Sequence, residues 1–176
     1  MILSGHEIFR AVENGDIVVA PFNASQLGTN SYDFRLGPTL LQYREPSVDV
    51  RVNNPTNELT IGPEGIILRA GEFYLGHTLE VMGSNRYVPI IKGKSSIARL
   101  GLFIHATADL IDIGSINQWT LQLVPTIDVK LYPGMKIGQV TFWTVAGDIQ
   151  LYQGKYAGSR GPVASRGYLD FITDQT

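Results

Sequence analysis

The run KGKSSIARLGL (residues 92–102) concentrates side chains that suit a phosphate group. Its three cations and two hydroxyls are Lys92, Lys94, Arg99, Ser95 and Ser96. Phosphate oxygens accept hydrogen bonds from these groups, and Gly93 permits a close approach to backbone N–H donors. The spacing is not the G-x-x-x-x-G-K-[ST] of a Walker loop. The residues alone leave two interpretations open, a phosphate site or a helix start capped by a serine.

A second polar cluster lies in HATADLIDIG (residues 105–114). Asp109 and Asp112 are three residues apart among apolar neighbours, and His105 precedes them. Composition alone favours a turn in which Asp112 caps the chain before Gly114.

A third cluster, YQGKYAGSRGPVASR (residues 152–166), combines cations and aromatic rings with glycines. Its members are Lys155, Arg160, Arg166, Tyr152 and Tyr156. One interpretation is a solvated tail. The other is a lid that closes over an anionic ligand, with the rings shielding a base or sugar and the cations meeting phosphate.

Composition excludes several kinds of site. The chain has no cysteine, so disulfides, a cysteine nucleophile and the H-x-E with P-C-x-x-C zinc site of the zinc deaminases are excluded. Its three histidines, His6, His77 and His105, are far apart in sequence, and no G-x-S-x-G motif occurs. The 14 cationic and 16 acidic residues give a net charge of −2, which provides no electrostatic footprint for nucleic acid.

Targeting signals are likewise missing from the sequence. No run approaches the roughly 18 apolar residues that a membrane helix needs, and the first residues lack the order of a signal peptide. We therefore expect a cytoplasmic protein with no membrane segment. Its 176 residues are enough for one domain, residues 1–176, with its own hydrophobic core.

The elements that would position these clusters are mainly strands. Ser4 and Glu7 form a capping box for a short N-terminal helix that Gly15 stops. A period of two, rich in β-branched and aromatic residues, then predicts strands in residues 16–22, 31–37, 39–45, 64–70, 72–82, 87–93, 100–111, 118–125, 136–145 and 148–153. A long loop is expected within residues 47–65. The pattern predicts an all-β barrel or sandwich with a short N-terminal helix.

One predicted strand carries an unusual polar residue. In GSINQWTLQLVP (residues 114–125), Trp119, Leu121 and Leu123 alternate with Thr120 and Gln122. The alternation permits two interpretations of Gln122, a residue on a solvated face or a chemical group aimed into a pocket.

Several short sequence motifs of this chain occur together, in the same order, in one protein family. They are MILSG, NSYDFRLG, GKSSIARLGLFIHATADLID, WTLQL, PGMKIGQVTF, YQGKYAG and GPVASR. With them the chain resembles, over nearly its whole length, the dCTP deaminases, relatives of the trimeric dUTPases. The resemblance implies a distorted β-barrel of the dUTPase type and a homotrimer with active sites between subunits. It also implies hydrolytic removal of the cytosine 4-amino group of dCTP, giving dUTP and ammonia without zinc.

The resemblance also implies roles for individual positions. Lys94 and Ser96 resemble triphosphate ligands. Ser95 and Arg99 resemble members of the catalytic cluster, with Arg99 entering a neighbour's site. Ala108 resembles the position whose backbone carbonyl holds the attacking water.

Other positions resemble sugar, arm and regulatory residues. Asp112 corresponds to the acid that contacts the deoxyribose 3′-hydroxyl, and residues 152–176 to a C-terminal arm that folds over a triphosphate bridged by Mg²⁺. His105 lies where the family senses dTTP as a feedback inhibitor. The implied nucleotide-binding set is Lys94, Ser95, Ser96, Arg99, Thr107, Asp112, Gln122, Tyr152, Lys155, Tyr156 and Ser159.

The chain departs from the family pattern at four positions. Gln122 replaces the catalytic glutamate, Ser115 an aromatic residue, Asn117 a glycine and Ser159 a glutamine. In the family mechanism the glutamate takes a proton from water as the water attacks C4. A neutral amide cannot hold that proton, and general base catalysis is typically worth about 10²–10⁴-fold in rate.

Three explanations of Gln122 remain open. It is an isosteric change in an otherwise active deaminase, or it marks a protein that acts on a different substrate, or it marks a nucleotide-binding regulator that has lost its chemistry. For the second explanation the candidates are dUTP, cleaved at the pyrophosphate as in dUTPases and bifunctional relatives, or a dCTP substituted at C5. Asp109 and Asp112 are the nearby carboxylates in sequence that could replace the missing base.

Overall fold

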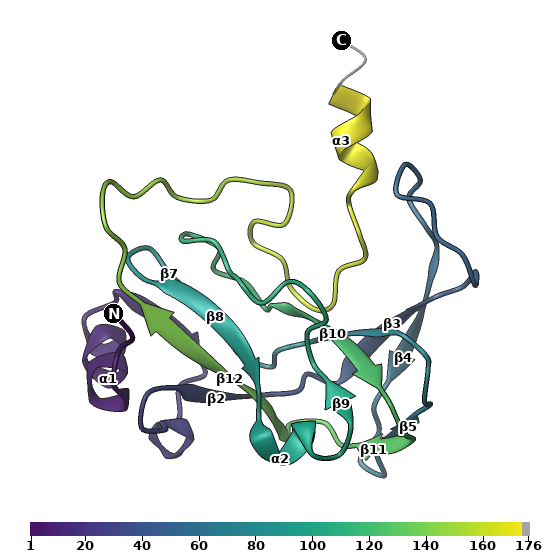
Figure 1. Ribbon diagram of the computed structural model, residues 1–176, viewed down its shortest axis with the longest axis horizontal. Coiled ribbons are helices and arrows are strands. Elements are labelled where there is room, and N and C mark those ends of the chain that lie inside the picture. The colour runs from purple at the N-terminus through teal and green to yellow at the C-terminus, as the bar shows by residue number, and fades with distance from the viewer. Residues whose placement is uncertain (174–176) are drawn as a thin grey trace.

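The computed structural model describes residues 1–173, and Figure 1 shows its arrangement. Helix α1 (Gly5–Glu13) begins at Ser4, whose hydroxyl accepts a 3.3 Å hydrogen bond from the backbone N–H of Glu7. The Glu7 carboxylate pairs with Arg10 at 2.9 Å. Gly15 follows the helix with φ 78°, a left-handed conformation that favours glycine. The predicted N-terminal helix and its stop are confirmed.

Short strands make up most of the remaining chain. They are β1 (Ile17–Ala20), β2 (Tyr32–Arg35), β3 (Thr39–Tyr43), β4 (Thr56–Thr60), β5 (Ile66–Leu68), β6 (Tyr74–His77), β7 (Val81–Ser84), β8 (Val88–Gly93), β9 (Leu102–Phe103), β10 (Thr120–Pro125), β11 (Val129–Leu131) and β12 (Lys136–Trp143). Three helical pieces join them: η1 (Ala24–Gln26), α2 (Ser95–Ala98) and α3 (Tyr168–Thr173). The predicted all-β class with a short N-terminal helix is confirmed.

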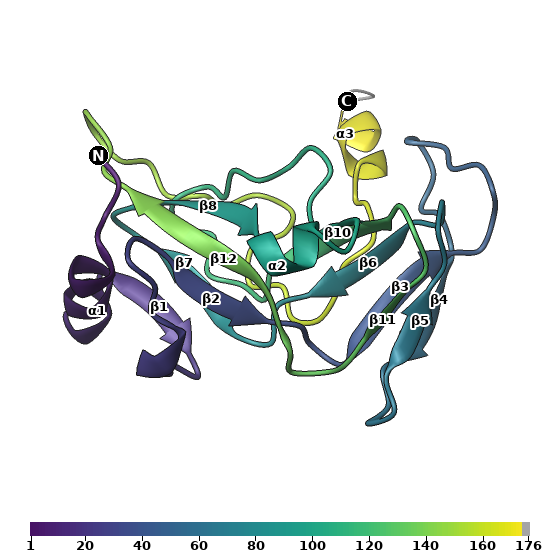
Figure 2. The ribbon, with the colours of Figure 1, turned by 60° about the horizontal axis from the view of Figure 1, so that its bottom comes forward.

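The strands pair antiparallel in four sheets. The largest has the order β4-β3-β6-β10-β9, the next is β2-β12-β8, and β1-β7 and β11-β5 form two-stranded sheets. Figure 2 shows α1 and β1 at one end of the molecule and β3, β4 and β5 at the other. The resemblance implied a distorted β-barrel of the dUTPase type; among residues 1–173 these sheets stay separate and form no closed barrel.

The interruption between β6 and β7 gives a physical reason for the open sheets. Residues 72–82 were expected to form one strand, but side chains take over backbone groups in the middle of this run. The Thr78 hydroxyl accepts a hydrogen bond from the backbone N–H of Trp119 at 3.0 Å, and the Glu80 carboxylate accepts one from the backbone N–H of Arg35 at 2.9 Å. The backbone N–H groups of Thr78 and Leu79 bond to the carbonyls of Trp119 and Arg35, so the run changes partners here and β6 and β7 belong to different sheets.

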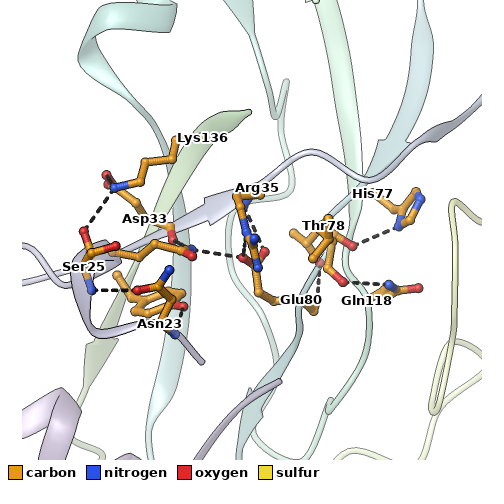
Figure 3. Close-up of polar contacts among 12 residues, drawn as sticks. Asn23, Ser25, Asp33, Arg35, His77, Thr78, Glu80, Gln118 and Lys136 are labelled. Carbon is orange, nitrogen blue, oxygen red and sulfur yellow. Dashed lines mark hydrogen bonds and ion pairs between the residues drawn. The ribbon is translucent and has the colours of Figure 1, made fainter. Parts of the chain in front are cut away.

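Glu80 is the centre of a buried polar network (Figure 3). Its side chain is fully buried, and it accepts hydrogen bonds from Arg35 Nε at 2.7 Å and Gln26 Nε2 at 3.0 Å. A buried carboxylate is tolerated only when it is paired and hydrogen-bonded in this way. The network therefore fixes β2 against the segment that leads into β7.

Other expected elements differ from the observed ones. Residues 148–153 form no strand, and residues 100–111 contribute only the two residues of β9. β4 forms inside the expected loop 47–65, and β11 and α3 were not predicted. No helix within residues 1–173 combines the length and apolar character required to cross a membrane.

Candidate functional site

A cavity of about 470 Å³ lies against β10, within the range typical of small-molecule sites. Its walls come from the polar side of β10, the loop that leads into it and the C-terminal arm. The lining residues are Tyr43, Phe73, Leu75, Ala108, Leu110, Ile111, Asp112, Ser115, Asn117, Gln118, Trp119, Thr120, Gln122, Tyr152, Tyr156, Ser159, Val163 and Ser165. Six of the predicted site residues are therefore brought together, five of them being Ala108, Asp112, Gln122, Tyr152 and Tyr156. Ser159 is the sixth.

The alternation of β10 aims Gln122 into this cavity. Leu121 and Leu123 are fully buried in the core, whereas Thr120 and Gln122 are half-buried and line the cavity. The prediction of a pocket-facing amide is confirmed, and the solvated strand face is wrong.

Two backbone donors hold the Gln122 side chain. Gln122 Oε1 accepts hydrogen bonds from the backbone N–H of Ala106 at 2.9 Å and of Thr107 at 3.2 Å. The same strand residue donates its own backbone N–H to the carbonyl of Ile104 at 3.0 Å. Gln122 thus fixes the loop 105–108 against β10.

The aspartate cluster divides between two environments. Asp112 lines the cavity and starts a turn in which the Ser115 N–H donates to its carbonyl at 3.1 Å, with Gly114 at φ 90°. The predicted turn is confirmed. Asp109 instead pairs with Lys92 at 2.7 Å, and the hydrogen bond from Lys92 lowers the pKa of its carboxyl. Asp109 is therefore engaged outside the cavity and is a weaker base than a free aspartate.

His105 lies in the same loop but does not line the cavity. Burial lowers the pKa of its imidazole, while the charge of Asp109 opposes the shift. Thr107 contributes its backbone N–H to Gln122, and its side chain is not part of the lining.

Two of the residues that depart from the family pattern meet on one wall of the cavity. Asn117 Nδ2 donates a 2.8 Å hydrogen bond to Ser115 Oγ, and both side chains are buried. Asn117 Oδ1 has no hydrogen-bond partner among residues 1–173. The ring N–H of Trp119 points to the carbonyl of Ser115 at 3.4 Å. The wall beside Trp119 is thus polar where an aromatic residue was expected.

The C-terminal arm is bound to its own chain through β10 and the residues before it. Gln118 donates its backbone N–H to the carbonyl of Ser159 at 3.1 Å and accepts from the N–H of Gly161 at 2.8 Å through Oε1. Thr120 Oγ1 accepts from the N–H of Val163 at 3.0 Å. The interpretation of residues 152–166 as a solvated tail is wrong. Residues 174–176 of the predicted arm lie outside the described residues.

Two tyrosines of the arm form the outer rim. Tyr152 anchors its backbone N–H to the carbonyl of Ile113 at 2.7 Å, and its hydroxyl accepts from the N–H of Tyr156 at 3.2 Å. Gly154 permits this packing, because a Cβ there would lie 2.5 Å from the Tyr152 ring. Lys155 points away from the cavity and pairs with Asp170, which raises the pKa of its amine.

The cationic cluster is not brought to this cavity. Lys94, Ser95, Ser96 and Arg99 all lie at α2, and none of them lines it. In Figure 1, α2 and α3 lie at opposite edges of the molecule. The serine-capped helix start is wrong, since Lys94 occupies the N-cap position and no side chain caps the helix.

Lys94 is held by the adjacent strands. Its Nζ lies 2.6 Å from Asp33 Oδ2, and Lys136 Nζ approaches the same oxygen at 3.7 Å. Figure 3 shows Asp33 and Lys136 beside the Glu80 network. The network thus extends from the core to the first residue of the cationic cluster.

Sequence reasoning missed several lining residues that anchor the arm. Gln118 and Thr120 belong to the alternating run, but the alternation does not reveal their partners in the arm. Tyr43 and Val163 come from distant parts of the chain, and no motif marks them. Within residues 1–173 no group of three histidine, cysteine, aspartate or glutamate side chains could hold a metal ion.

Comparisons with known proteins agree with the quoted motifs. A family model described as dCTP deaminase-like matches residues 2–145. A relative from Clostridium botulinum (strain Eklund 17B) is 41% identical over 172 residues, which are 97% of this chain and 99% of that protein. A relative from Clostridium acetobutylicum is 42% identical over 173 residues, 98% of this chain and 99% of its own length. Both are named "dCTP deaminase, dUMP-forming".

A solved structure shares the fold. It is the crystal structure of 2′-deoxycytidine 5′-triphosphate deaminase from Agrobacterium tumefaciens, with a TM-score of 0.64 and 21% sequence identity. The alignment covers 80% of this chain and 47% of the solved chain, so this chain spans about half of that protein. At this identity the likeness establishes the fold alone.

Proposed function

Since the chain belongs to the dCTP deaminase-like family, we propose that it hydrolyses dCTP and dUTP to dUMP in the cavity against β10. The name of the relatives implies that dCTP loses both its amino group and pyrophosphate. The balanced reaction is dCTP plus two waters giving dUMP, ammonia and pyrophosphate. The observation that carries the proposal is the convergence of Ala108, Asp112, Gln122 and Tyr152 on one cavity.

The two hydrolyses place different demands on this chain. Removal of ammonia requires a proton acceptor beside C4, and the Gln122 amide cannot serve as one. We expect deamination to be slower by about 10²–10⁴-fold than with a carboxylate. Cleavage between the α- and β-phosphates takes place away from C4. Gln122 therefore favours a second candidate function, hydrolysis of dUTP to dUMP and pyrophosphate.

The cavity residues have distinct proposed roles. Asp112 accepts a hydrogen bond from the deoxyribose 3′-hydroxyl, and Tyr152 and Tyr156 cover the base and sugar from the arm. The backbone carbonyl of Ala108 holds a water beside the base. Ser115 stands where the family has an aromatic side chain, which supports acceptance of dCTP with a substituent at C5.

The triphosphate ligands are proposed to come from a neighbouring subunit. The separation of Lys94, Ser95, Ser96 and Arg99 from the cavity supports a homotrimer in which α2 of one subunit meets the arm of another. Arg160 and Arg166 of the arm supply further positive charge near the triphosphate. Magnesium is proposed to arrive bound to phosphate oxygens, and zinc plays no part in the proposed reaction. His105 is a proposed contact for dTTP as an inhibitor, in a cytoplasmic enzyme.

The proposal is tested by following ammonia and pyrophosphate separately. The full chain is mixed with dCTP, dUTP or 5-methyl-dCTP in Mg²⁺ buffer. We expect pyrophosphate from dUTP and little ammonia from dCTP. Failure of all three nucleotides to bind would overturn the proposal. Tight binding without either product would favour the nucleotide-binding regulator.

A further inference from the structure

The orientation of the Gln122 amide is fixed by the chain itself. Two backbone N–H groups, those of Ala106 and Thr107, converge on Oε1 at 2.9 and 3.2 Å. Reversing the amide would set Nε2, which only donates, against two other donors. A donor facing a donor forfeits both hydrogen bonds, so the observed orientation is the stable one.

The consequence is that Gln122 offers the cavity a donor. Gln122 lines the cavity, and its Nε2 has no hydrogen-bond partner among residues 1–173. Oε1, the acceptor, is occupied by the loop 105–108. The free capacity at this position is therefore that of an N–H donor.

Cytosine and uracil differ at C4 in whether the substituent donates or accepts a hydrogen bond. Cytosine carries a 4-amino group, which donates, and uracil carries a 4-oxo group, which accepts. On the proposed function, in which C4 of the bound nucleotide lies at position 122, Nε2 pairs with a 4-oxo oxygen and opposes a 4-amino group. Resting on that function, we propose that Gln122 is a specificity-determining residue, which selects 4-oxo over 4-amino pyrimidine deoxynucleoside triphosphates.

The acidic groups of the cavity agree with this assignment. Asp112 is the one carboxylate among the described lining residues, and it lies in the turn that ends at Ser115. Asp109 is paired with Lys92 outside the cavity. No second carboxylate in the described lining offers the 4-amino group an acceptor in place of position 122. The acceptor without a partner, Asn117 Oδ1, is buried on the wall that Asn117 forms with Ser115 and Trp119.

A carboxylate at position 122 would reverse the preference. In the Gln122→Glu variant one oxygen can keep the bonds to Ala106 and Thr107, and the other faces the cavity as an acceptor. An acceptor suits the 4-amino group and opposes the 4-oxo group. Because the loop contacts are kept, the change acts on the ligand more than on the fold.

The test compares the binding of two ligands whose α,β-imido bridge prevents pyrophosphate release. The cytosine ligand keeps its 4-amino group, so ammonia is assayed after each titration of Gln122→Glu to establish that this ligand is intact. Dissociation constants of α,β-imido-dUTP and α,β-imido-dCTP are measured by titration calorimetry with Mg²⁺ on the full chain and the Gln122→Glu variant. A site with one buried hydrogen-bonding group discriminates by at least about tenfold. We expect the unchanged chain to bind the uracil ligand at least about tenfold more tightly, and the variant to shift this ratio at least about tenfold toward cytosine.

Gln118→Glu is the matched control, because Gln118 also lines the cavity. Both of its amide atoms are engaged, Nε2 with the carbonyl of Leu79 at 2.9 Å and Oε1 with the N–H of Gly161 at 2.8 Å. This variant adds the same charge and should weaken both ligands alike, with the ratio unchanged.

The outcomes separate this inference from the proposed function. Equal binding of the two ligands by the unchanged chain, or a preference for cytosine, overturns the inference and leaves a nucleotide site standing. A ratio that does not move in folded Gln122→Glu also overturns it. Absence of binding to either ligand overturns the proposed function and the inference together. The ratio for the unchanged chain decides the matter even where a variant fails to fold.

Discussion

The cavity wall at β10 and the cationic turn at α2 hold their polar side chains in opposite ways. On the cavity wall, Gln118, Thr120 and Gln122 are half-buried and bonded to the arm or to the loop 105–108. At α2, Ser95, Ser96 and Arg99 are exposed, and Arg99 bonds only to the backbone of its own turn. The wall is organised before a ligand arrives, whereas the turn is not.

The residues around α2 are also more exposed than those around the cavity wall. Next to α2, Leu100 is 49% exposed and Phe103 is 58% exposed. Exposed apolar side chains that lie together, here beside the exposed Arg99, are typical of a surface that another chain covers. This difference supports the proposal that one subunit holds the base and sugar and that a second subunit supplies the phosphate ligands.

The largest expected effect is the loss of Arg99 at the turn. Arg99→Ala should reduce pyrophosphate release from dUTP by about 10³-fold, because a positioned cation that stabilises developing negative charge is worth this much. The melting temperature should be unchanged, since the side chain is exposed. Lys130→Ala is the control, an exposed cation on β11 that should keep full activity. Full activity in Arg99→Ala would remove α2 from the site.

The second largest expected effect is an increase in the rate of deamination, caused by a substitution on the cavity wall. Gln122→Glu should increase ammonia release from dCTP by at least about 10²-fold, because a carboxylate can take the proton from the attacking water. Gln122→Ala separates this effect from mere loosening of the loop, since it removes the contacts to Ala106 and Thr107 and adds no base. If Gln122→Glu releases ammonia from dCTP as slowly as Gln122→Ala does, position 122 lies away from C4.

A smaller effect is expected where the wall meets the arm. Gln118→Ala removes two hydrogen bonds, to Leu79 and Gly161, each worth about 0.5–1.5 kcal/mol. We expect faster hydrogen exchange at Gly161 and Val163 and a KM raised by roughly tenfold. Thr120→Val removes only the bond to Val163 and should give the weaker of the two effects. Unchanged exchange in both variants would mean that other contacts hold the arm.

The sequence predicts those features of the two regions that depend on contacts between residues close together in the chain. The alternation of β10 and the Ser4 cap are local patterns, and both are confirmed. The bond between Gln118 and Gly161 joins residues 43 positions apart, and no pattern within either segment encodes it. The position of α2 relative to the cavity also depends on contacts between distant segments. The family motifs therefore assign the α2 residues and the cavity residues to one site, although within a single chain α2 does not line the cavity.

Glu80 shows a different reason for failure. It lies in the apolar run 72–82, where alternation predicts one uninterrupted strand. Its partners, Arg35 and Gln26, come from elements about 45 and 54 residues away. A buried ion pair of this kind overrides strand propensity, because an unpaired carboxylate could not be buried at all.

The smallest expected effect is a change in thermal stability, and it concerns the ion pair that connects the cavity loop to the strand before α2. Lys92, at the end of β8 before α2, pairs with Asp109 in the cavity loop at 2.7 Å. The hydrogen bond from Lys92 lowers the pKa of Asp109 below the ordinary value of an aspartate. The pair therefore contributes stability above that value, and the contribution is lost as the pH falls through the lowered pKa in the folded protein.

Asp109→Asn tests this ion pair through the pH dependence of the melting temperature. Because the Asp109 carboxylate is solvent-exposed and screened, we expect a slightly lower melting temperature than that of the unchanged chain at pH 7, and a smaller difference in high salt. The two curves should converge once the pH is below the lowered pKa of Asp109, where this carboxyl is protonated in both the folded and the unfolded states of the unchanged chain. A difference of constant size from pH 7 to below this pKa would contradict an electrostatic link. The coupling of the cavity loop to β8 would then rest on the backbone bonds from Ile91 to Asp109 and from Ile111 to Pro89.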